Sequence, residues 1–142
     1  MKIYITKASQ LPGSDFREIH NQAFAVYKQI KQKTKRRVYV RSIYFNKEKI
    51  FLDLFWQHLF QKQNWRDRVR RLKFFPCALE LLQYSRFDPL TKDNPNRQSE
   101  SLHRFFGITK NGDKFIVQIK EDKRNRQKFL ISVFPESKKT SR

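Results

Sequence analysis

Apolar residues recur every three or four positions in the first half of the chain, and this spacing predicts amphipathic helices. The apolar face of the first helix is formed by Phe16, Ile19, Ala23, Val26, Tyr27 and Ile30. A second helix is expected after Asn46, which is a suitable cap, with an apolar face of Phe51, Phe55 and Leu59. His58 follows the same spacing and is expected to pack against that face.

Two further helices are expected before the chain changes character. A basic stretch that begins at Trp65 keeps helical spacing through Val69 and Leu72, so its charges are expected on the outer face of a helix. Pro76 suits the first position of a following helix that runs to about Tyr84.

Alternating and β-branched residues predict strands at both ends of the chain. Short strands are expected at 1–6 and 38–45, and three more at 102–109, 115–120 and 129–134. Residues 87–101 have no periodicity and are expected to form a long loop. The predicted fold is α+β: an N-terminal strand and helices, then a C-terminal antiparallel meander curved around them. We expect one domain over 1–142, with a mostly helical part at 1–86, a sheet at 102–135 and a basic tail at 136–142.

The dipeptide Asn111-Gly112 predicts a hairpin between the first two strands of the meander. A two-residue loop places His103 opposite Lys120 and puts Ile108, Phe106, Phe115, Val117, Ile119, Phe129, Ile131 and Val133 on the core face. The opposite face then carries His103, Phe105, Gln118, Lys120, Leu130, Ser132 and Phe134. A three-residue loop with a bulge at Gly112 would set Ile108 against Lys114. We favour the two-residue loop because it matches apolar residues across the strands.

The charge of the chain points to a polyanionic partner. The 142 residues include 32 Lys and Arg against 13 Asp and Glu, a net charge of +19 with a pI near 10.4. Nucleic acid is the first expectation; acidic membrane surface and an acidic protein are the lesser ones. The candidate contacts are Lys35, Arg36, Arg37, Arg68, Arg70, Arg71, Phe105, Gln118, Lys123, Arg124 and Arg126.

Several classes of function are disfavoured. No apolar run is long enough for a membrane span, and the first residues do not form a signal peptide, so the cytoplasm is the expected compartment. A single cysteine, Cys77, excludes an internal disulfide and a cysteine-based zinc site. Acidic residues are too scarce for metal-dependent nuclease chemistry. We expect neither a metal nor another cofactor.

A sheet face that combines an imidazole, an ammonium group, a hydroxyl and an aromatic ring suits metal-free cleavage of RNA. One group must take the ribose 2′-OH proton, another must protonate the leaving oxygen, and cations must stabilise the charge on phosphorus. His103 can serve in either proton transfer. A basic sheet with exposed aromatics is equally typical of RNA-binding domains without catalysis.

The order of elements and the run from His103-Arg104-Phe105-Phe106-Gly107 through the meander resemble the RelE-like and barnase/EndoU/colicin-type ribonuclease superfamily, in particular its phage-associated branch. The likeness covers about the last 60 residues. It implies a small metal-independent endoribonuclease, often a toxin, with active residues on the sheet. Carried over, these are His103 as general acid or base, Lys120 and Arg104 stabilising the phosphate, and Ser132 as an orienting hydrogen-bond donor. In the favoured register Arg104 points to the core side.

The expected partners follow from this hypothesis. They are RNA (tRNA, mRNA or ribosome-bound mRNA) and an acidic antitoxin or immunity protein, with no membrane. The main alternative is a non-catalytic nucleic-acid-binding domain that uses a basic sheet and helix surface; a third is a protein-interaction domain with an acidic partner. The catalytic hypothesis depends on His103 and Lys120 lying side by side, away from the core.

Overall fold

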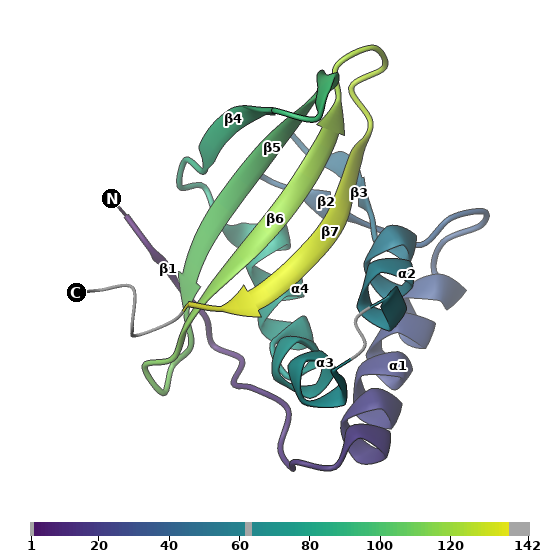
Figure 1. The fold of residues 1–142 in the computed structure, drawn as a ribbon, viewed down its shortest axis with the longest axis vertical. Coiled ribbons are helices and arrows are strands. Elements are labelled where there is room, and N and C mark those ends of the chain that lie inside the picture. The colour runs from purple at the N-terminus through teal and green to yellow at the C-terminus, as the bar shows by residue number, and fades with distance from the viewer. Residues whose placement is uncertain (1, 62–63, 137–142) are drawn as a thin grey trace.

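The structure, a computed structural model, describes residues 2–61 and 64–136 and consists of four helices and a curled sheet. The fold is α+β, as predicted (Figure 1). The helices are α1 (Phe16–Gln32), α2 (Asp53–Gln61), α3 (Trp65–Leu72) and α4 (Phe75–Tyr84). Residues 137–142 of the predicted basic tail lie outside the described residues.

Three helices form where the apolar spacing predicts them. The helix expected after Asn46 begins only at Asp53, and Phe51, expected on its apolar face, lies in the strand Glu48–Phe51. Asp15 accepts a hydrogen bond from the Glu18 amide and caps α1, which buries Ile19 and Ala23. In α3, Val69 and Leu72 are buried as expected. Of its basic residues, Arg66 and Arg70 are exposed, whereas Arg68 and Arg71 are half-buried. The most deeply buried helix is α4, which begins with a proline in its first turn and carries six buried residues.

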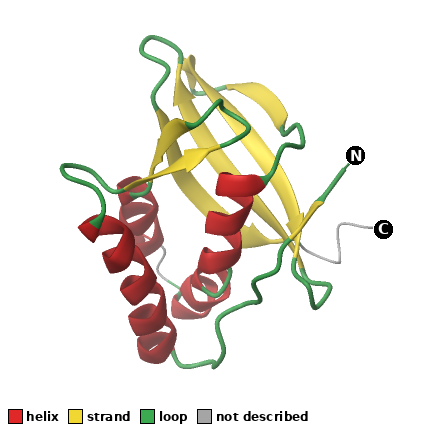
Figure 2. Ribbon diagram, turned by 180° about the vertical axis from the view of Figure 1, so that it is seen from behind, coloured by secondary structure: helices red, strands yellow, loops and turns green. Residues whose placement is uncertain are grey.

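All the strands join a single mixed sheet of seven strands. They are β1 (Tyr4–Ile5), β2 (Tyr39–Ser42), β3 (Glu48–Phe51), β4 (Leu90–Asn94), β5 (Arg97–Ile108), β6 (Lys114–Asp122) and β7 (Lys128–Pro135). The order is β1-β5-β6-β7-β3-β2, and β4 also pairs with β5. The helices lie on one side of the sheet, which leaves its other side open (Figures 1 and 2).

We name the two sides of β5, β6 and β7 by their residues. The inner face, toward the helices, carries the buried residues Phe105, Phe115, Val117, Ile119, Leu130 and Val133. The outer face faces the viewer in Figure 1 and consists of three rungs of directly paired residues: Phe106–Ile116–Phe134, Arg104–Gln118–Ser132 and Leu102–Lys120–Phe129. A bulge in β7 makes Ile131 the extra residue between Leu130 and Ser132.

The register of the β5–β6 hairpin differs from the favoured one. Ile108 pairs with Lys114, and the loop consists of Lys110, Asn111 and Gly112. The Thr109 amide donates to the Asp113 carbonyl, and Gly112 has a φ of 94°, a left-handed conformation that glycine adopts readily. The three-residue loop is therefore correct, and the favoured two-residue loop is wrong.

This one-residue shift turns the side chains of β5 over. Phe105 and His103 lie on the inner face, whereas Phe106, Ile108 and Arg104 lie on the outer one, contrary to prediction. In β6 the prediction of Phe115, Val117 and Ile119 as core is confirmed. In β7 the bulge brings Leu130 inward and Phe129 outward, opposite to expectation, while Val133, Ser132 and Phe134 lie where predicted.

One predicted loop forms strands, and one predicted helix start forms a turn. Most of the expected loop at 87–101 forms β4 and the start of β5, which pair with each other. The side chains of β4 are almost all exposed, so it carries no apolar alternation, and main-chain hydrogen bonds hold it in place. Asn46 does not cap a helix: Asn46 and Lys47 have φ of 57° and 67° and form the turn between β2 and β3.

Candidate nucleic-acid interface

His103 occupies a closed polar position on the inner face. Its Nε2 donates a hydrogen bond to the Glu121 carboxylate at 2.7 Å, and Thr91 Oγ1 lies 2.8 Å from its Nδ1. Phe45 packs against the ring with 5.3 Å between centroids. The residue is 8% exposed. Because both ring nitrogens are bonded to protein groups, His103 has no nitrogen left to exchange a proton with a substrate.

The other members of this buried cluster also neutralise one another. Glu121 lies 3.6 Å from Arg126 and 3.8 Å from Lys128, whose amine also contacts Glu48. Buried charges that are paired and hydrogen-bonded in this way avoid most of the cost of desolvation. Ser101, His103, Glu121, Lys123 and Arg126 line a shallow pocket beside the cluster.

Lys120 lies on the opposite face of the sheet from His103. It pairs with Leu102 in the ladder, and its amine is 3.6 Å from Glu100 and 5.3 Å from the centroid of the Phe129 ring. The structure thus does not bring the imidazole of His103 and the amine of Lys120 together. The geometric basis of the predicted catalytic pair is wrong, because the pairing register is shifted by one residue.

The other three predicted catalytic residues share the outer face. Arg104, Gln118 and Ser132 form its central rung, and Lys120 lies on the next rung. Arg104 Nε donates to Gln118 Oε1 at 2.9 Å. From α3, Arg71 reaches the same rung and donates to Ser132 Oγ at 2.9 Å, while its Nε bonds to Asp67 at 2.8 Å.

Cations and aromatic rings alternate across the outer face. The guanidinium carbons of Arg71 and Arg104 lie 5.4 and 5.9 Å from the centroid of the Phe134 ring. At the other end, Arg37 lies 4.4 Å from the Phe51 centroid and 5.2 Å from that of Phe129, and it also pairs with Asp53. Such distances allow cation–π attraction.

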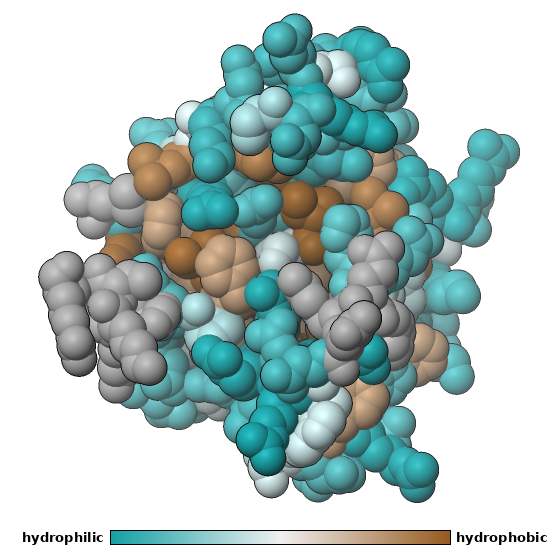
Figure 3. Space-filling model, in the orientation of Figure 1, coloured by the Kyte–Doolittle hydropathy of each residue, from teal (hydrophilic) through white to brown (hydrophobic). Residues whose placement is uncertain are grey.

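Apolar side chains gather in the middle of this face, and hydrophilic ones surround them (Figure 3). Ile116 is 9% exposed and forms part of its floor; Phe106, Phe129 and Phe134 are half-buried. A half-buried aromatic floor with a cationic rim is suited to stacking of bases and to contact with the phosphates between them.

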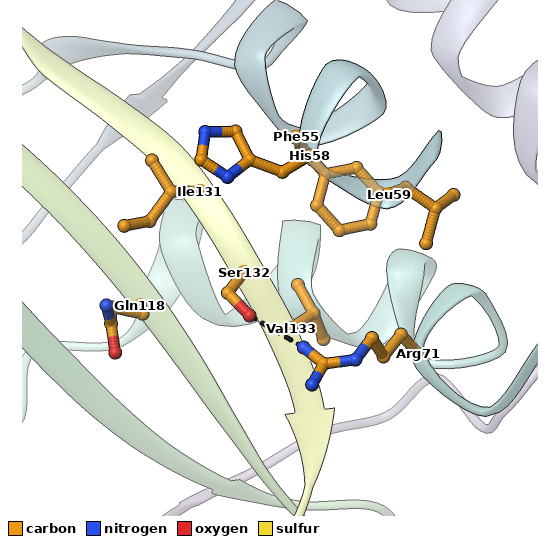
Figure 4. Close-up of a pocket in the computed structure, with 8 residues that line it drawn as sticks. All are labelled: Phe55, His58, Leu59, Arg71, Gln118, Ile131, Ser132 and Val133. Carbon is orange, nitrogen blue, oxygen red and sulfur yellow. Dashed lines mark hydrogen bonds between the residues drawn. The ribbon is translucent and has the colours of Figure 1, made fainter. Parts of the chain in front are cut away.

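A pocket of about 220 Å³ opens beside the central rung, where β7 passes α2 and α3 (Figure 4). Its apolar walls come from Phe55, Leu59, Ile131 and Val133, and its polar groups are His58, Arg71, Gln118 and Ser132. Ser132 lies between Gln118 and Arg71, with the hydroxyl turned toward the guanidinium. His58, expected to pack against the helix's apolar face, is exposed and lines this pocket instead.

The remaining predicted contacts fall into three groups. Phe105 is 3% exposed and packs against Tyr44, so it is not available to a ligand. Lys35, Arg36 and Arg70 are exposed, and Arg68 is half-buried. In the β6–β7 turn, carboxylates pair with each cation: Lys123 with Asp93, Arg124 with Asp122 and Arg126 with Glu121. The Arg124 side-chain hydrogen bond holds the pKa of Asp122 below its usual value.

Of the rings that form the aromatic part of the site, only Phe134 was predicted on this face. Phe51 belongs to a strand that was not expected, and Phe129 was assigned to the core. The parallel pairing of β3 with β7 sets Phe51 opposite Phe129, a long-range contact that leaves no local pattern. The only clue to His58 in the sequence is that it is a polar residue on an otherwise apolar helical face.

The described residues contain neither a cluster suited to a metal ion nor a helix suited to a membrane. No group of three or more His, Cys, Asp or Glu side chains there is placed to hold a metal ion. Within that same part of the chain, no helix is both long and apolar enough to cross a bilayer. No protein-family model matches the chain, and searches of curated proteins and of solved structures find no match either.

Proposed function

We propose that this protein is an RNA-binding domain that holds a single strand on the outer face of its sheet. The observation that carries the proposal is the central rung of Arg104, Gln118 and Ser132, with Arg71 bonded to its end and the Phe134 ring beneath both guanidinium groups. Arginine provides contacts to phosphate, and an aromatic ring stacks an unpaired base.

The choice of nucleic acid follows from charge and shape. A net charge of +19 favours a polyanion over a neutral ligand. Half-buried aromatic rings on an open sheet suit bases that are not already stacked and paired in a duplex. RNA presents such unpaired bases in loops and ends, whereas most cellular DNA is duplex. These arguments favour single-stranded RNA.

Fluorescence anisotropy measures the affinity of the protein for a short labelled RNA. The experiment compares the wild-type protein with variants substituted on the outer face. Arg104→Ala is expected to weaken binding by about tenfold, because it removes a charged contact at the centre. Phe134→Leu is expected to weaken it similarly, whereas Phe134→Tyr, which keeps the ring, retains affinity. Arg17→Ala, which removes an exposed arginine from α1, is the matched control. Wild-type affinity in both Arg104→Ala and Phe134→Leu would overturn the proposal.

We propose metal-independent endoribonuclease activity as a second candidate function, and one observation favours it. His58, Arg71 and Ser132 line the same pocket on the RNA-binding face, which supplies both an imidazole and a guanidinium. In the proposed reaction the ribose 2′-oxygen attacks phosphorus and loses its proton to a base. The 5′-oxygen leaves with a proton from an acid, which yields a 2′,3′-cyclic phosphate. His58 would serve in one of these transfers, and Arg71 would stabilise the charge on phosphorus.

This second candidate has its own assay. Labelled RNA is incubated with the protein in EDTA, and the products are examined for 2′,3′-cyclic phosphate ends. Cleavage that is lost in His58→Ala and kept in His103→Ala supports the assignment. If the wild-type protein binds RNA tightly but leaves it uncleaved, both as naked RNA and as ribosome-bound mRNA, the domain is a binding module without catalysis.

A further inference from the structure

The pocket beside the central rung has the size and lining for one nucleobase. We propose that it accepts a single unpaired base through an edge rich in hydrogen-bond acceptors, so that guanine binds there in preference to adenine. The inference rests on the proposed RNA-binding function and names the part of the RNA that this pocket recognises.

The size of the pocket argues for one part of a larger ligand. Its volume of about 220 Å³ is below the range of roughly 300–1,000 Å³ that is typical of sites for whole small molecules. The pocket opens onto the outer face between β7 and α2, next to the Arg104–Gln118–Ser132 rung (Figure 4). An RNA strand lying along the outer face would therefore place one of its bases in the pocket.

The walls of the pocket suit the flat faces of a base. Phe55 and Leu59 from α2 and Ile131 and Val133 from β7 form its apolar lining. Ile131 lines the pocket because the β7 bulge adds one residue at this point of the strand. Burial of a base between apolar side chains removes its faces from water and leaves its edge to the polar groups.

Three of the four polar groups in the lining, Gln118, Ser132 and Arg71, offer mainly donors. Gln118 Oε1 already accepts from Arg104, which leaves the amide nitrogen of Gln118 as a donor. Ser132 Oγ accepts from Arg71, so its own hydrogen points elsewhere. One amino group of Arg71 is used by Ser132 and its Nε by Asp67; the second amino group has no bond to another described residue.

This excess of donors selects the edge of the base. Guanine presents two adjacent acceptors, O6 and N7, and arginine commonly binds them as a pair. Adenine presents N7 beside an amino group, which would face the donors of Arg71, Gln118 and Ser132. A donor that meets another donor in a buried pocket is left unpaired, which is costly.

The experiment compares short uridine-tract RNAs that differ at one central position. That position carries guanine, adenine or an abasic site, and a fully paired duplex of the guanine strand is added as a fourth probe. We expect guanine to bind about tenfold more tightly than adenine, and the abasic and duplex probes to bind more weakly than the guanine strand. Gln118→Ala and Arg71→Lys should abolish the preference for guanine, so that the guanine strand binds no more tightly than the adenine strand.

The control variant and the outcomes separate the two proposals. Phe134 lies outside the pocket lining. Phe134→Leu should therefore weaken the binding of all single strands equally and retain the preference for guanine. Equal binding of the guanine, adenine and abasic strands by the wild-type protein would overturn the base pocket and leave RNA binding in place. Duplex bound as tightly as the single strand would also overturn it. Binding of none of the probes would overturn both proposals.

Discussion

At the scale of single residues, the role of a histidine depends on what its two ring nitrogens contact. In His103 the Glu121 carboxylate can only accept, so Nε2 carries a proton, and Nδ1 lies 2.8 Å from the Thr91 hydroxyl. The three side chains connect β4, β5 and β6 across the inner face. This arrangement indicates that His103 stabilises the sheet and does not take part in proton transfer to RNA.

His103→Ala should lower the free energy of unfolding by about 2–3 kcal/mol, because a buried carboxylate loses a charge-assisted hydrogen bond and a small cavity is left. Urea denaturation followed by circular dichroism measures this loss. The affinity of the folded variant for RNA should stay within about twofold of wild type, since the ring lies on the face away from the outer rungs.

The matched substitution on the other face is Lys120→Ala, which should reduce RNA affinity and cost little stability. Lys120 is only partly exposed and pairs with Glu100, so the effect on binding should be smaller than that of Arg104→Ala.

A His103→Ala protein with unchanged stability and lost RNA binding would show that the histidine belongs to the site after all.

At the scale of elements, the sequence predicted the helices better than the strand register. Each helix buries one side, so a period of three to four residues is visible in the chain. The strands of the meander instead carry apolar residues on both faces, such as Phe105 beside Phe106 and Phe115 beside Ile116. Matching apolar residues across the hairpin therefore does not distinguish the two registers.

The observed register depends on contacts that local pattern does not reveal. Gly107 pairs with Phe115, and a Cβ at Gly107 would lie 2.5 Å from the Phe115 ring and 2.8 Å from Leu81 of α4. Only glycine fits where the sheet and α4 approach so closely. The same one-residue shift decides the candidate site: it brings Arg104 onto the face of Gln118, Lys120 and Ser132 and removes His103 from it.

A further element contact gives a prediction with a defined pH dependence. Glu80 of α4 accepts hydrogen bonds from the amides of Lys7 and Ala8 and from the Tyr4 hydroxyl, which fixes the N-terminal segment against the helix. Burial alone raises the pKa of Glu80, but the hydrogen bonds from Lys7, Ala8 and Tyr4 outweigh it and lower the pKa below its ordinary value. The carboxylate form is therefore the one that the folded state favours.

Glu80→Gln should destabilise the protein by about 1 kcal/mol at neutral pH, because an amide accepts these hydrogen bonds less strongly than a carboxylate does. Because the pKa of Glu80 is lowered in the folded state, its carboxylate stabilises the fold fully at a pH above its ordinary pKa of about 4.3. This contribution is lost as the pH falls through the folded-state pKa. Urea denaturation from neutral to acidic pH should show the wild-type and variant curves converging in acid. Parallel curves over the whole range would contradict this account of Glu80.

At the scale of the whole molecule, a net charge of +19 overstates the charge that the outer face presents. Arg37, Arg71 and Lys120 each pair with a carboxylate: Asp53, Asp67 and Glu100. Arg104 differs, because its described partners are the neutral Gln118 amide and the Phe134 ring. The proposed interface is thus a few defined contacts on an aromatic floor, whereas most of the excess charge lies elsewhere on the surface.

The salt dependence of RNA binding distinguishes a defined interface from a diffuse basic surface. For single strands, the logarithm of the binding constant falls with that of the salt concentration with a slope of about −0.7 for each phosphate neutralised. Two to four contacts on the outer face predict a slope of roughly −1.5 to −3, which anisotropy titrations at several salt concentrations measure. Arg104→Ala should make the slope shallower by about 0.7, and Arg17→Ala should leave it unchanged. A slope of about −7 or steeper would mean about ten phosphate contacts, more than this face provides, and would point to binding spread over the whole cationic surface.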